Sequence, residues 1–438
     1  MKEFVMKEYR MPHINTTNST MPTENRKRKL EDNNETSSKI IAVSKVKHSG
    51  DEKAISGYVL ACGQGIVGQL GLGEDVMEKK RFQMVTKQPV GIKIAAGGMH
   101  SLYLDSSGTV YSFGCNDECA LGRVTAEEEE CFVPKKVEIP TKIVQISAGD
   151  SHSAALDEVG DVYIWGTFRD NNGVLGLNPG QLRPLITPTL LEGVPKIQKI
   201  SSGYNHLALL STDQRLFTCG CAEQGELGRV PRTSVVKGGR RGIGKILLPA
   251  EVRFSRRNIK VVDVWSFSYN TFCRTADNKI YAWGLNNYHQ LGINEEYVNN
   301  YFMPKHVSAL TKLGTISDIK GGEHHTVIKT ESGLVFVLGR GDCGRLGNGH
   351  EDTYSQSVPY QLPLQDVSII GCGSCVSFAV NSEGKLYSWG FGTNNQLGNG
   401  DDEDLLEPTL ITSKQLEARK VIEVSAGGQH SLSLVKDS

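Results

Sequence analysis

The sequence predicts an all-β fold: a seven-bladed β-propeller with one blade closed by both termini, preceded by a disordered basic N-terminal tail. Three patterns indicate this fold. A Leu-Gly pair recurs seven times, at spacings of 51 to 64 residues. A histidine landmark recurs in phase with that pair, and the residues after it alternate between apolar and polar. Repeated units of about fifty residues made of short strands are typical of propeller blades, which are four-stranded antiparallel sheets.

Each repeat carries the same landmarks in the same order. The leucines of the Leu-Gly pairs are Leu70, Leu121, Leu175, Leu227, Leu291, Leu346 and Leu397. The histidine position is held by His100, His152, His206, His325 and His430, and by Asn270 and Val376 in the other two repeats. In HSAALDEVGDVYIWG, residues 152–166, two alternating runs flank a Glu-Val-Gly-Asp turn, which predicts a β-hairpin. Most of these histidines are expected to pack and hydrogen-bond within the propeller.

The two ends of the repeat region complete one another. The first unit begins at residues 59–63, VLACG, which correspond to the strand before each Leu-Gly, and no histidine landmark precedes it. The last unit, around His430, stops before its closing glycine and its Leu-Gly. We therefore expect the termini to share one blade, which would lock the ring and remove an exposed sheet edge. The propeller is predicted over residues 57–438.

Residues 1–56 have a different composition. They contain 11 Lys or Arg, 8 Asp or Glu, and only Phe4 and Tyr9 as aromatic residues. A segment with so little to bury is expected to be a disordered tail. The basic run Arg26, Lys27, Arg28 and Lys29 has the form of a nuclear-localisation signal, although a solvated charge run looks the same. No run of about 18 apolar residues occurs, so no membrane span is expected.

The composition also argues against several kinds of site. Ten cysteines in a chain without a signal peptide are expected to be reduced thiols of a cytosolic or nuclear protein. The CxxC at Cys372 and Cys375 has no second pair at zinc-site spacing, and histidines on different blades would be too far apart to share an ion, so we expect no metal and no cofactor. A hydrolase would need clustered carboxylates or a Ser/His/Asp arrangement, and a light sensor a dense tryptophan cluster. The four tryptophans are dispersed.

Two segments interrupt the repeats. The first is FRDNNGV, residues 168–174, which is polar and contains glycine, as loops do. The second is indicated by the spacing of 64 residues between Leu227 and Leu291. From Arg229 to Lys260 there are ten basic residues and a single acidic one, Glu251. This imbalance predicts an acidic partner, and a solvated basic loop without a partner is the alternative.

Longer stretches identify a family. They are AAGGMHSLYL (95–104), YSFGCNDECALGR (111–123), FRDNNGVLGL (168–177), CAEQGELGRVP (221–231) and SAGGQHSLSLV (425–435). With the Leu-Gly loops and Ala-Gly-x-x-His turns, they resemble the regulator of chromosome condensation family over residues 57–438. The resemblance implies a chromatin-bound guanine-nucleotide exchange factor for the small GTPase Ran, which performs no covalent chemistry. An interaction or chromatin adaptor of the same propeller family, without exchange activity, is the alternative.

The resemblance also implies which residues bind the GTPase. Residues 168–174 match a wedge that presses on the GTPase near its phosphate-binding loop and switch II. Asp150, His430 and either His324 or His325 match residues needed for exchange. The implied GTPase-binding set is Asp150, Phe168, Arg169, Asp170, Asn171, Asn172, Gly173, Asn205, His324, His325 and His430.

Two positions depart from the family pattern. Asn205 stands in Gly-Tyr-Asn-His where the family has Gly-Asn-Asp-His, and Ile66 replaces the acid of Gly-Gln-Gly-Asp. Both changes remove negative charge from the expected GTPase-binding face. Because asparagine keeps the size and hydrogen-bonding capacity of aspartate, we expect weaker exchange rather than none.

The basic segments imply a location on chromatin. In the family, the loop that corresponds to residues 229–260 inserts arginines into the acidic patch of the nucleosomal histones, and Arg232, Lys237, Arg240 and Arg241 are the matching candidates in this chain. The tail is expected to contact nucleosomal DNA through phosphates, and such contacts weaken with salt. Its run from Arg26 to Lys29 would bind a nuclear import receptor. The expected location is the nucleus, on chromatin, after passage through the cytoplasm.

Overall fold

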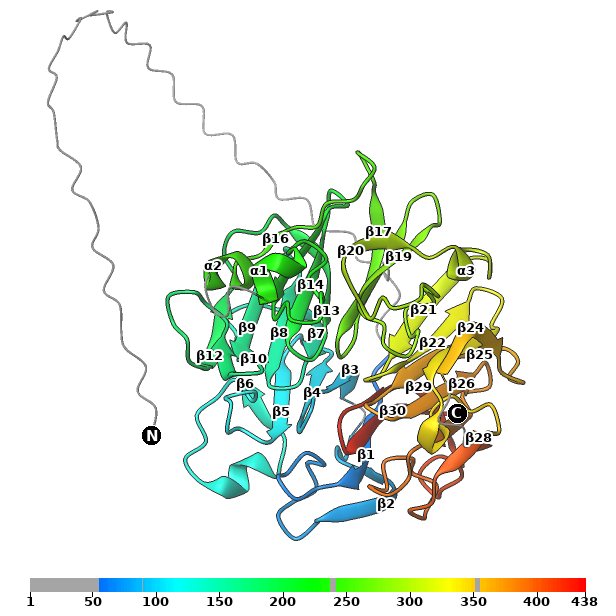
Figure 1. Ribbon diagram of the computed structural model, residues 1–438. Helices are drawn as coiled ribbons and strands as arrows, with labels where there is room; N and C mark the ends of the chain where they lie inside the picture. The colour runs from blue at the N-terminus through cyan, green and yellow to red at the C-terminus, as the bar shows by residue number, and fades with distance from the viewer. Residues whose placement is uncertain (1–54, 89, 237–241, 351–354) are drawn as a thin grey trace, which may run out of the picture. The chain divides into compact units, whose positions relative to one another are not determined.

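The fold was determined from a computed structural model that describes residues 55–88, 90–236, 242–350 and 355–438. All of the predicted tail before residue 55, including Arg26, Lys27, Arg28 and Lys29, lies outside these ranges. Within them, the strands form seven four-stranded antiparallel sheets and one separate two-stranded hairpin (Figure 1). The predicted seven-bladed β-propeller is therefore confirmed. The first strand of every blade lines one central cavity of about 770 Å³, so these strands are the innermost ones.

Six blades follow one another along the chain, and in each of them the first strand is innermost and the last strand is outermost. The first three are β3 (Gly91–Ala96), β4 (His100–Asp105), β5 (Val110–Gly114) and β6 (Lys135–Val137); β7 (Ile143–Ala148), β8 (His152–Asp157), β9 (Val162–Gly166) and β12 (Leu185–Leu190); and β13 (Ile197–Ser202), β14 (His206–Ser211), β15 (Leu216–Gly220) and β16 (Ala250–Glu251). The next three are β17 (Val261–Ser266), β18 (Asn270–Thr275), β19 (Ile280–Leu285) and β20 (Asn300–His306); β21 (Ile316–Gly321), β22 (His325–Thr330), β23 (Val335–Arg340) and β24 (Ser355–Gln361); and β25 (Val367–Cys372), β26 (Val376–Asn381), β27 (Leu386–Gly390) and β28 (Leu405–Leu410).

The seventh blade is built from both ends of the described chain. Its strands, again from the inside outward, are β29 (Arg419–Ala426), β30 (His430–Asp437), β1 (Tyr58–Gln64) and β2 (Glu78–Met84). Strand β30 pairs with β1 from Tyr58 opposite Val435 to Gly63 opposite His430. Figure 1 shows the last strand, in red, beside the first, in blue. The prediction of a blade shared by the termini is confirmed.

Short elements occupy the connections. The separate hairpin consists of β10 (Phe168–Asp170) and β11 (Gly173–Gly176) and interrupts the third repeat. The helical pieces are α1 (Arg232–Val236), α2 (Ile243–Leu247) and α3 (Ser308–Thr311), with short 3-10 turns at Glu128–Cys131 and Asp342–Gly344. No helix in the described ranges has the length and apolar character needed to cross a membrane.

The Leu-Gly motif is a contact between neighbouring blades. The indole Nε1 of Trp165, on β9, donates a hydrogen bond to the carbonyl of Ala120 in the loop of the preceding blade, at 2.8 Å. Gly122 in that loop has a φ of 69°, and a Cβ there would lie 2.7 Å from the same Nε1. Two constraints therefore favour glycine at this position: the left-handed backbone conformation, and the indole of Trp165, which leaves no room for a Cβ. The same contact joins Gly228 to Trp283 and Gly347 to Trp389.

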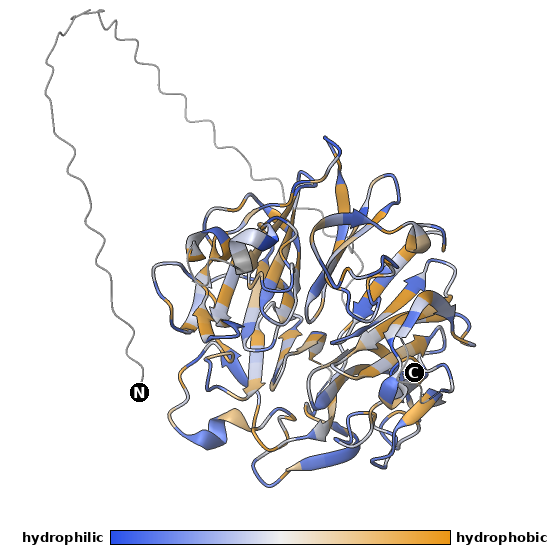
Figure 2. Cartoon of the chain, viewed as in Figure 1, coloured by the Kyte–Doolittle hydropathy of each residue, from blue (hydrophilic) through white to orange (hydrophobic). Residues whose placement is uncertain are grey.

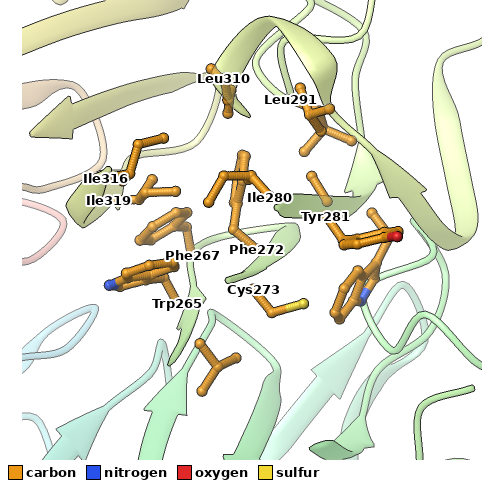
Figure 3. Close-up of a cluster of buried hydrophobic side chains, with 14 of the residues drawn as sticks. Trp265, Phe267, Phe272, Cys273, Ile280, Tyr281, Leu291, Leu310, Ile316 and Ile319 are labelled. Atoms are coloured by element: carbon orange, nitrogen blue, oxygen red, sulfur yellow. The ribbon is translucent and has the colours of Figure 1, made fainter. Parts of the chain in front are cut away.

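Apolar side chains fill the space between blades. Strands alternate along their length between apolar and polar residues (Figure 2), and the apolar faces of neighbouring blades meet. Figure 3 shows one such cluster, in which Trp265 and Phe267 lie against Ile316 and Ile319 of the next blade. All ten cysteines lie in the described ranges and are unpaired; four are buried and six are partly exposed.

Candidate functional site

One end of the propeller carries the residues that the sequence singled out. In each blade, the connection between the first and second strands lies at the same end as the connection between the third and fourth strands. The pairing shows this, because His152 at the start of the second strand lies opposite Gly166 at the end of the third, as His100 lies opposite Gly114. All Ala-Gly-x-x-His turns and Leu-Gly loops therefore emerge at the same end, which we call the Leu-Gly face. Asp150, the β10–β11 hairpin, Asn205 and His324 all lie on it.

The β10–β11 hairpin stands on an apolar anchor. Phe168 is fully buried, and its ring packs edge-on against His152 with 4.6 Å between ring centroids. At the tip, the backbone N–H of Asn172 donates to Oδ1 of Asp170 at 2.8 Å, and Gly173 has a φ of 95°, which favours glycine. The tip from Asp170 to Gly173 thus projects from a fixed base. Phe168 belongs to that base. It was predicted to contact the partner, but its side chain is buried and exposes no surface for such a contact.

Both neighbouring blades brace this hairpin. The guanidinium of Arg169 forms an ion pair with Glu118, in the loop after β5. On the other side, the backbone N–H of Arg169 donates to Oδ1 of Asn205 at 2.8 Å, and that of Asn171 donates to Oε2 of Glu223 at 3.2 Å. Two backbone N–H groups held from one side and a guanidinium held from the other leave the hairpin little freedom to bend. Glu118 and Glu223 were missed by the sequence reasoning.

A pocket of about 540 Å³ opens beside the hairpin. It is lined by six of the predicted residues, namely Asp150, Arg169, Asp170, Asn171, Asn205 and His324. They come from three different blades, so the fold brings together residues up to 174 positions apart. Gly173, at the hairpin tip, and Asn172 lie outside the pocket lining. The gathering of these side chains is what a single partner-binding site requires.

The pocket is acidic. Four carboxyl groups line it, those of Asp150, Asp170, Glu223 and Glu226, against one arginine whose guanidinium is already paired with Glu118. Burial raises the pKa of Glu226 to about 8, and the charge of Glu223 adds to that shift, so Glu226 is mostly protonated at pH 7 and adds little negative charge to the pocket. A field of this sign favours a basic surface on a partner. Glu226 was not predicted, although it occupies the position before Leu-Gly, where its backbone carbonyl accepts the indole hydrogen bond of Trp283 at 2.7 Å.

Adjacent histidines in the sequence have opposite environments. His324 lies partly exposed on the Leu-Gly face, with its ring 5.0 Å from that of Tyr288 and 6.3 Å from that of Tyr269. Burial, with the charges of Arg340 and Arg345, lowers its pKa to about 4, so the ring is neutral at pH 7. His325 is buried, and its Nε2 lies 2.8 Å from Oγ of Ser377 on the next blade. Only His324 is placed to contact a partner.

His325 and His430 were predicted to be needed for exchange, and because both side chains are buried, any such role would be indirect rather than through contact with a partner. His430 is fully buried, and its Nε2 lies 2.8 Å from Oγ of Ser101, which in turn donates to the carbonyl of Gln69 at 2.8 Å. Because the serine hydrogen goes to that carbonyl, the histidine Nε2 must be the donor. Loss of either histidine would remove a hydrogen bond between neighbouring blades, from His325 to Ser377 or from His430 to Ser101. The expectation that most of these histidines pack and hydrogen-bond is the one the structure supports.

The exposed apolar residue Ile66 also lies on this face, in the loop after β1, and is 61 % exposed. It contributes no charge at the position where the family pattern has an acid. Within the described ranges, no group of three or more His, Cys, Asp or Glu side chains is arranged to hold a metal ion.

The basic segment divides into structural and exposed residues. Arg229 donates to the carbonyls of Thr218, Lys245, Ile246 and Leu248, at 2.7 to 3.3 Å, and so holds α2 against β15. Arg232, at the start of α1, is exposed. The other candidates for nucleosome binding, Lys237, Arg240 and Arg241, lie outside the described residues. Arg253, Arg256 and Arg257 are exposed in the connection between β16 and β17, at the opposite end from the Leu-Gly face.

Comparisons with known proteins agree with this architecture. Residues 58–433 match the family model described as RCC1-like domain. The chain is 45 % identical over 407 residues to a regulator of chromosome condensation from Mus musculus, covering 91 % of this chain and 94 % of that protein. It is 32 % identical to guanine nucleotide exchange factor SRM1 from Saccharomyces cerevisiae, covering 86 % of each. Among solved structures, Prp20p from the same yeast, described with its binding properties to Gsp1p and histones, superposes with a TM-score of 0.80 at 31 % identity, covering 89 % of this chain and 94 % of that one.

Proposed function

Because the chain belongs to the regulator of chromosome condensation family, we propose that it is a guanine-nucleotide exchange factor for the small GTPase Ran that works while bound to chromatin. The name of the yeast relative states the activity, and the yeast structure is described with a protein partner and with histones. The observation that carries the proposal is the acidic pocket, in which Asp150, Asn205 and His324 meet the braced hairpin.

Exchange requires no nucleophile, acid–base pair or metal ion. The factor accelerates GDP release by binding the nucleotide-free GTPase more tightly than the nucleotide-bound form, and the coupling between factor and nucleotide is reciprocal. In our proposal the hairpin tip presses on the phosphate-binding loop of Ran, while Asp150 and His324 hold the GTPase from other parts of the face. The bracing by Glu118, Asn205 and Glu223 supports this role, since a wedge that yielded would not displace its target.

Asn205 has a place in this mechanism despite its lost charge. Its amide oxygen accepts the N–H of Arg169 as a carboxylate oxygen would, so the support of the hairpin is kept. What is lost is negative charge in the pocket. Slower but effective exchange is the expected consequence.

Chromatin attachment completes the proposal. Arg232, Lys237, Arg240 and Arg241 would contact the acidic patch of the nucleosomal histones, and the tail would contact nucleosomal DNA. Arg26, Lys27, Arg28 and Lys29 would bind an import receptor, which brings the protein from the cytoplasm to the nucleus. A chromatin-bound factor would load Ran with GTP beside chromosomes.

The test is release of fluorescent GDP from Ran at a substoichiometric amount of the full chain. Multiple-turnover release supports the exchange function. If the chain binds Ran or nucleosomes tightly but releases no GDP, it is an adaptor of the same family and the proposal is wrong.

A further inference from the structure

Backbone hydrogen bonds link the turns that surround the central cavity on the Leu-Gly face. Each bond joins the Ala-Gly-x-x-His turn of one blade to that of the next. They run from Gly98 N to Gly149 O, Asp150 N to Tyr204 O, Tyr204 N to Ser268 O, Glu323 N to Ser374 O, Ser374 N to Gly427 O and Gly428 N to Gly98 O, at 2.9 to 3.2 Å. Six of the seven junctions between blades are closed in this way in the described chain. The rim of the cavity is therefore nearly a continuous hydrogen-bonded ring.

The seventh junction, between the turns of Ser268 and Glu323, differs. No backbone hydrogen bond joins these two turns, both of which are fully described. The reason is Phe267, which holds the position of the glycine three residues before the histidine position in all six other turns. Its side chain fills the space beside Gly321, where a Cβ would lie 2.7 Å from Cδ2 of the ring. The two turns are kept apart by this ring.

Tyr204 spans the open junction from the far side. Its hydroxyl donates to Oε1 of Glu323 at 3.3 Å and contacts Oγ of Ser374 directly. Each hydroxyl has one hydrogen, so Ser374 donates to Tyr204 and Tyr204 donates to the carboxylate. The tyrosine belongs to the turn after β13, and its partners belong to the turns after β21 and β25. One side chain thus crosses the mouth of the cavity.

The residues next to this strut form the partner-binding face. Asn205, which follows Tyr204, supports the hairpin, and the N–H of Asp150 is bonded to the carbonyl of Tyr204. On the other side, His324 follows Glu323, and its ring stacks on Tyr269 across the same open junction. The strut therefore connects the Asp150–Asn205 side of the pocket to its His324 side.

We propose that Tyr204 is a positioning residue for nucleotide exchange: its hydroxyl holds the turn of His324 at a fixed separation from the turns of Asp150 and Asn205. This inference rests on the proposed function. A factor that grips the GTPase from several blades transmits force through the hairpin only if those blades keep their spacing. Without the strut, part of the binding energy would open the Ser268–Glu323 junction instead of displacing the phosphate-binding loop.

The test uses the full chain and Ran loaded with fluorescent GDP. Tyr204→Phe removes the hydroxyl and keeps the ring. We expect the maximal rate of GDP release, kcat, to fall about three- to tenfold, the size of one lost hydrogen bond, with KM for GDP-bound Ran changed less than about twofold. Ser374→Ala should lower kcat similarly, and the double variant should show less than the product of the two effects, because both remove the same link.

Tyr58→Phe is the matched control, since the Tyr58 hydroxyl also donates to a carboxylate, that of Asp437 at 3.5 Å, but at the opposite end of the closing blade. It should leave kcat unchanged. Amide hydrogen exchange of residues 321–325 should be faster in Tyr204→Phe than in the control. If the unmodified chain releases GDP and Tyr204→Phe has the same kcat, the inference is wrong while the proposed function stands. No release by the unmodified chain would overturn the proposed function and the inference with it.

Discussion

The two segments inserted into the propeller are held in different ways. The β10–β11 hairpin is fixed through two of its backbone N–H groups by one neighbouring blade and through the guanidinium of Arg169 by the other, and it rests on the buried ring of Phe168. The basic segment after β15 is tied down by the guanidinium of Arg229, and Arg232 points to solvent. The difference indicates two kinds of partner contact. In our proposal, the hairpin acts through shape and stiffness, and the basic segment acts through charge.

The largest effect should come from removing the stiff segment. Deletion of residues 169–173 should lower GDP release from Ran by about a hundredfold, near the upper end of typical coupling free energies between two sites. The measurement is fluorescent GDP release at fixed concentrations of both proteins. Nucleosome affinity and the melting temperature serve as controls and should hardly change, because the deleted residues lie at the surface of one loop. Unchanged GDP release would contradict the wedge role.

Reversing charges in the basic segment should have the opposite pattern of effects, weakening nucleosome binding and leaving GDP release unchanged. Arg240→Glu combined with Arg241→Glu should weaken nucleosome binding about 30-fold or more, as expected for arginines that dominate an interface. GDP release from Ran in solution should be unaffected, since the residues proposed to bind the GTPase, Asp150, His324 and the β10–β11 hairpin, are unchanged. The affinity is measured at two salt concentrations, and the remaining binding should be less salt-dependent than that of the unmodified chain. Unaltered affinity would remove this segment from the chromatin proposal.

Arg229→Ala tests whether the basic segment has a structural residue of its own. Its loss leaves several carbonyls without their donor, and we expect the free energy of unfolding to fall by about 2 kcal/mol. Arg232→Ala is the matched control and should change stability by less than about 0.5 kcal/mol, as exposed substitutions do. Urea unfolding of the three proteins gives the comparison. Equal stability of both variants would show that Arg229 does not hold α2 in place.

The blades could be predicted from the sequence because each repeated motif makes the same packing contact between neighbouring blades. The pair of Gly122 and Trp165 has a counterpart at Gly228 and Trp283, so the same contact can be read from the spacing alone. The orientation of individual side chains was harder to predict. His324 and His325 are adjacent, and only the start of β22 at His325 decides which ring turns inward. Glu118 and Glu223 gave no signal, since one ends in an ion pair across blades and the other binds a backbone N–H, and neither forms a sequence motif.

The buried histidines make the hairpin's base sensitive to acid. Burial lowers the pKa values of His152, His206, His325 and His430 to about 3 and that of His100 to about 4. Between these values and the unfolded value near 6.5, the unfolded chain binds more protons than the folded one. The stability that these histidines contribute is therefore constant above pH 7 and is lost as the pH falls below about 6.5, by about 1.4 kcal/mol per pH unit for each histidine.

Urea unfolding between pH 8 and pH 5 measures this slope. His152→Asn is the informative variant, because Asn270 already occupies the equivalent position in another blade. It should reduce the slope by one histidine's share while leaving the other four. A slope equal to that of the unmodified chain would mean that His152 is not buried in its neutral form beneath the hairpin.

The smallest expected effect concerns charge at the stiff segment itself. Asn205→Asp should keep the hydrogen bond to the N–H of Arg169, because a carboxylate oxygen accepts as the amide oxygen does. It adds one negative charge to a pocket that is proposed to bind a basic surface. A partly exposed charge contributes about 0.5–1 kcal/mol, so GDP release should be two- to fivefold faster at low salt, and the gain should shrink at high salt. Asn205→Ala adds no charge and removes the hydrogen bond to the N–H of Arg169, so it should slow GDP release instead. If Asn205→Asp and the unmodified chain release GDP equally fast at low salt, the hairpin's bracing rather than the charge of the pocket sets the rate, and the lost acid of this chain has no cost.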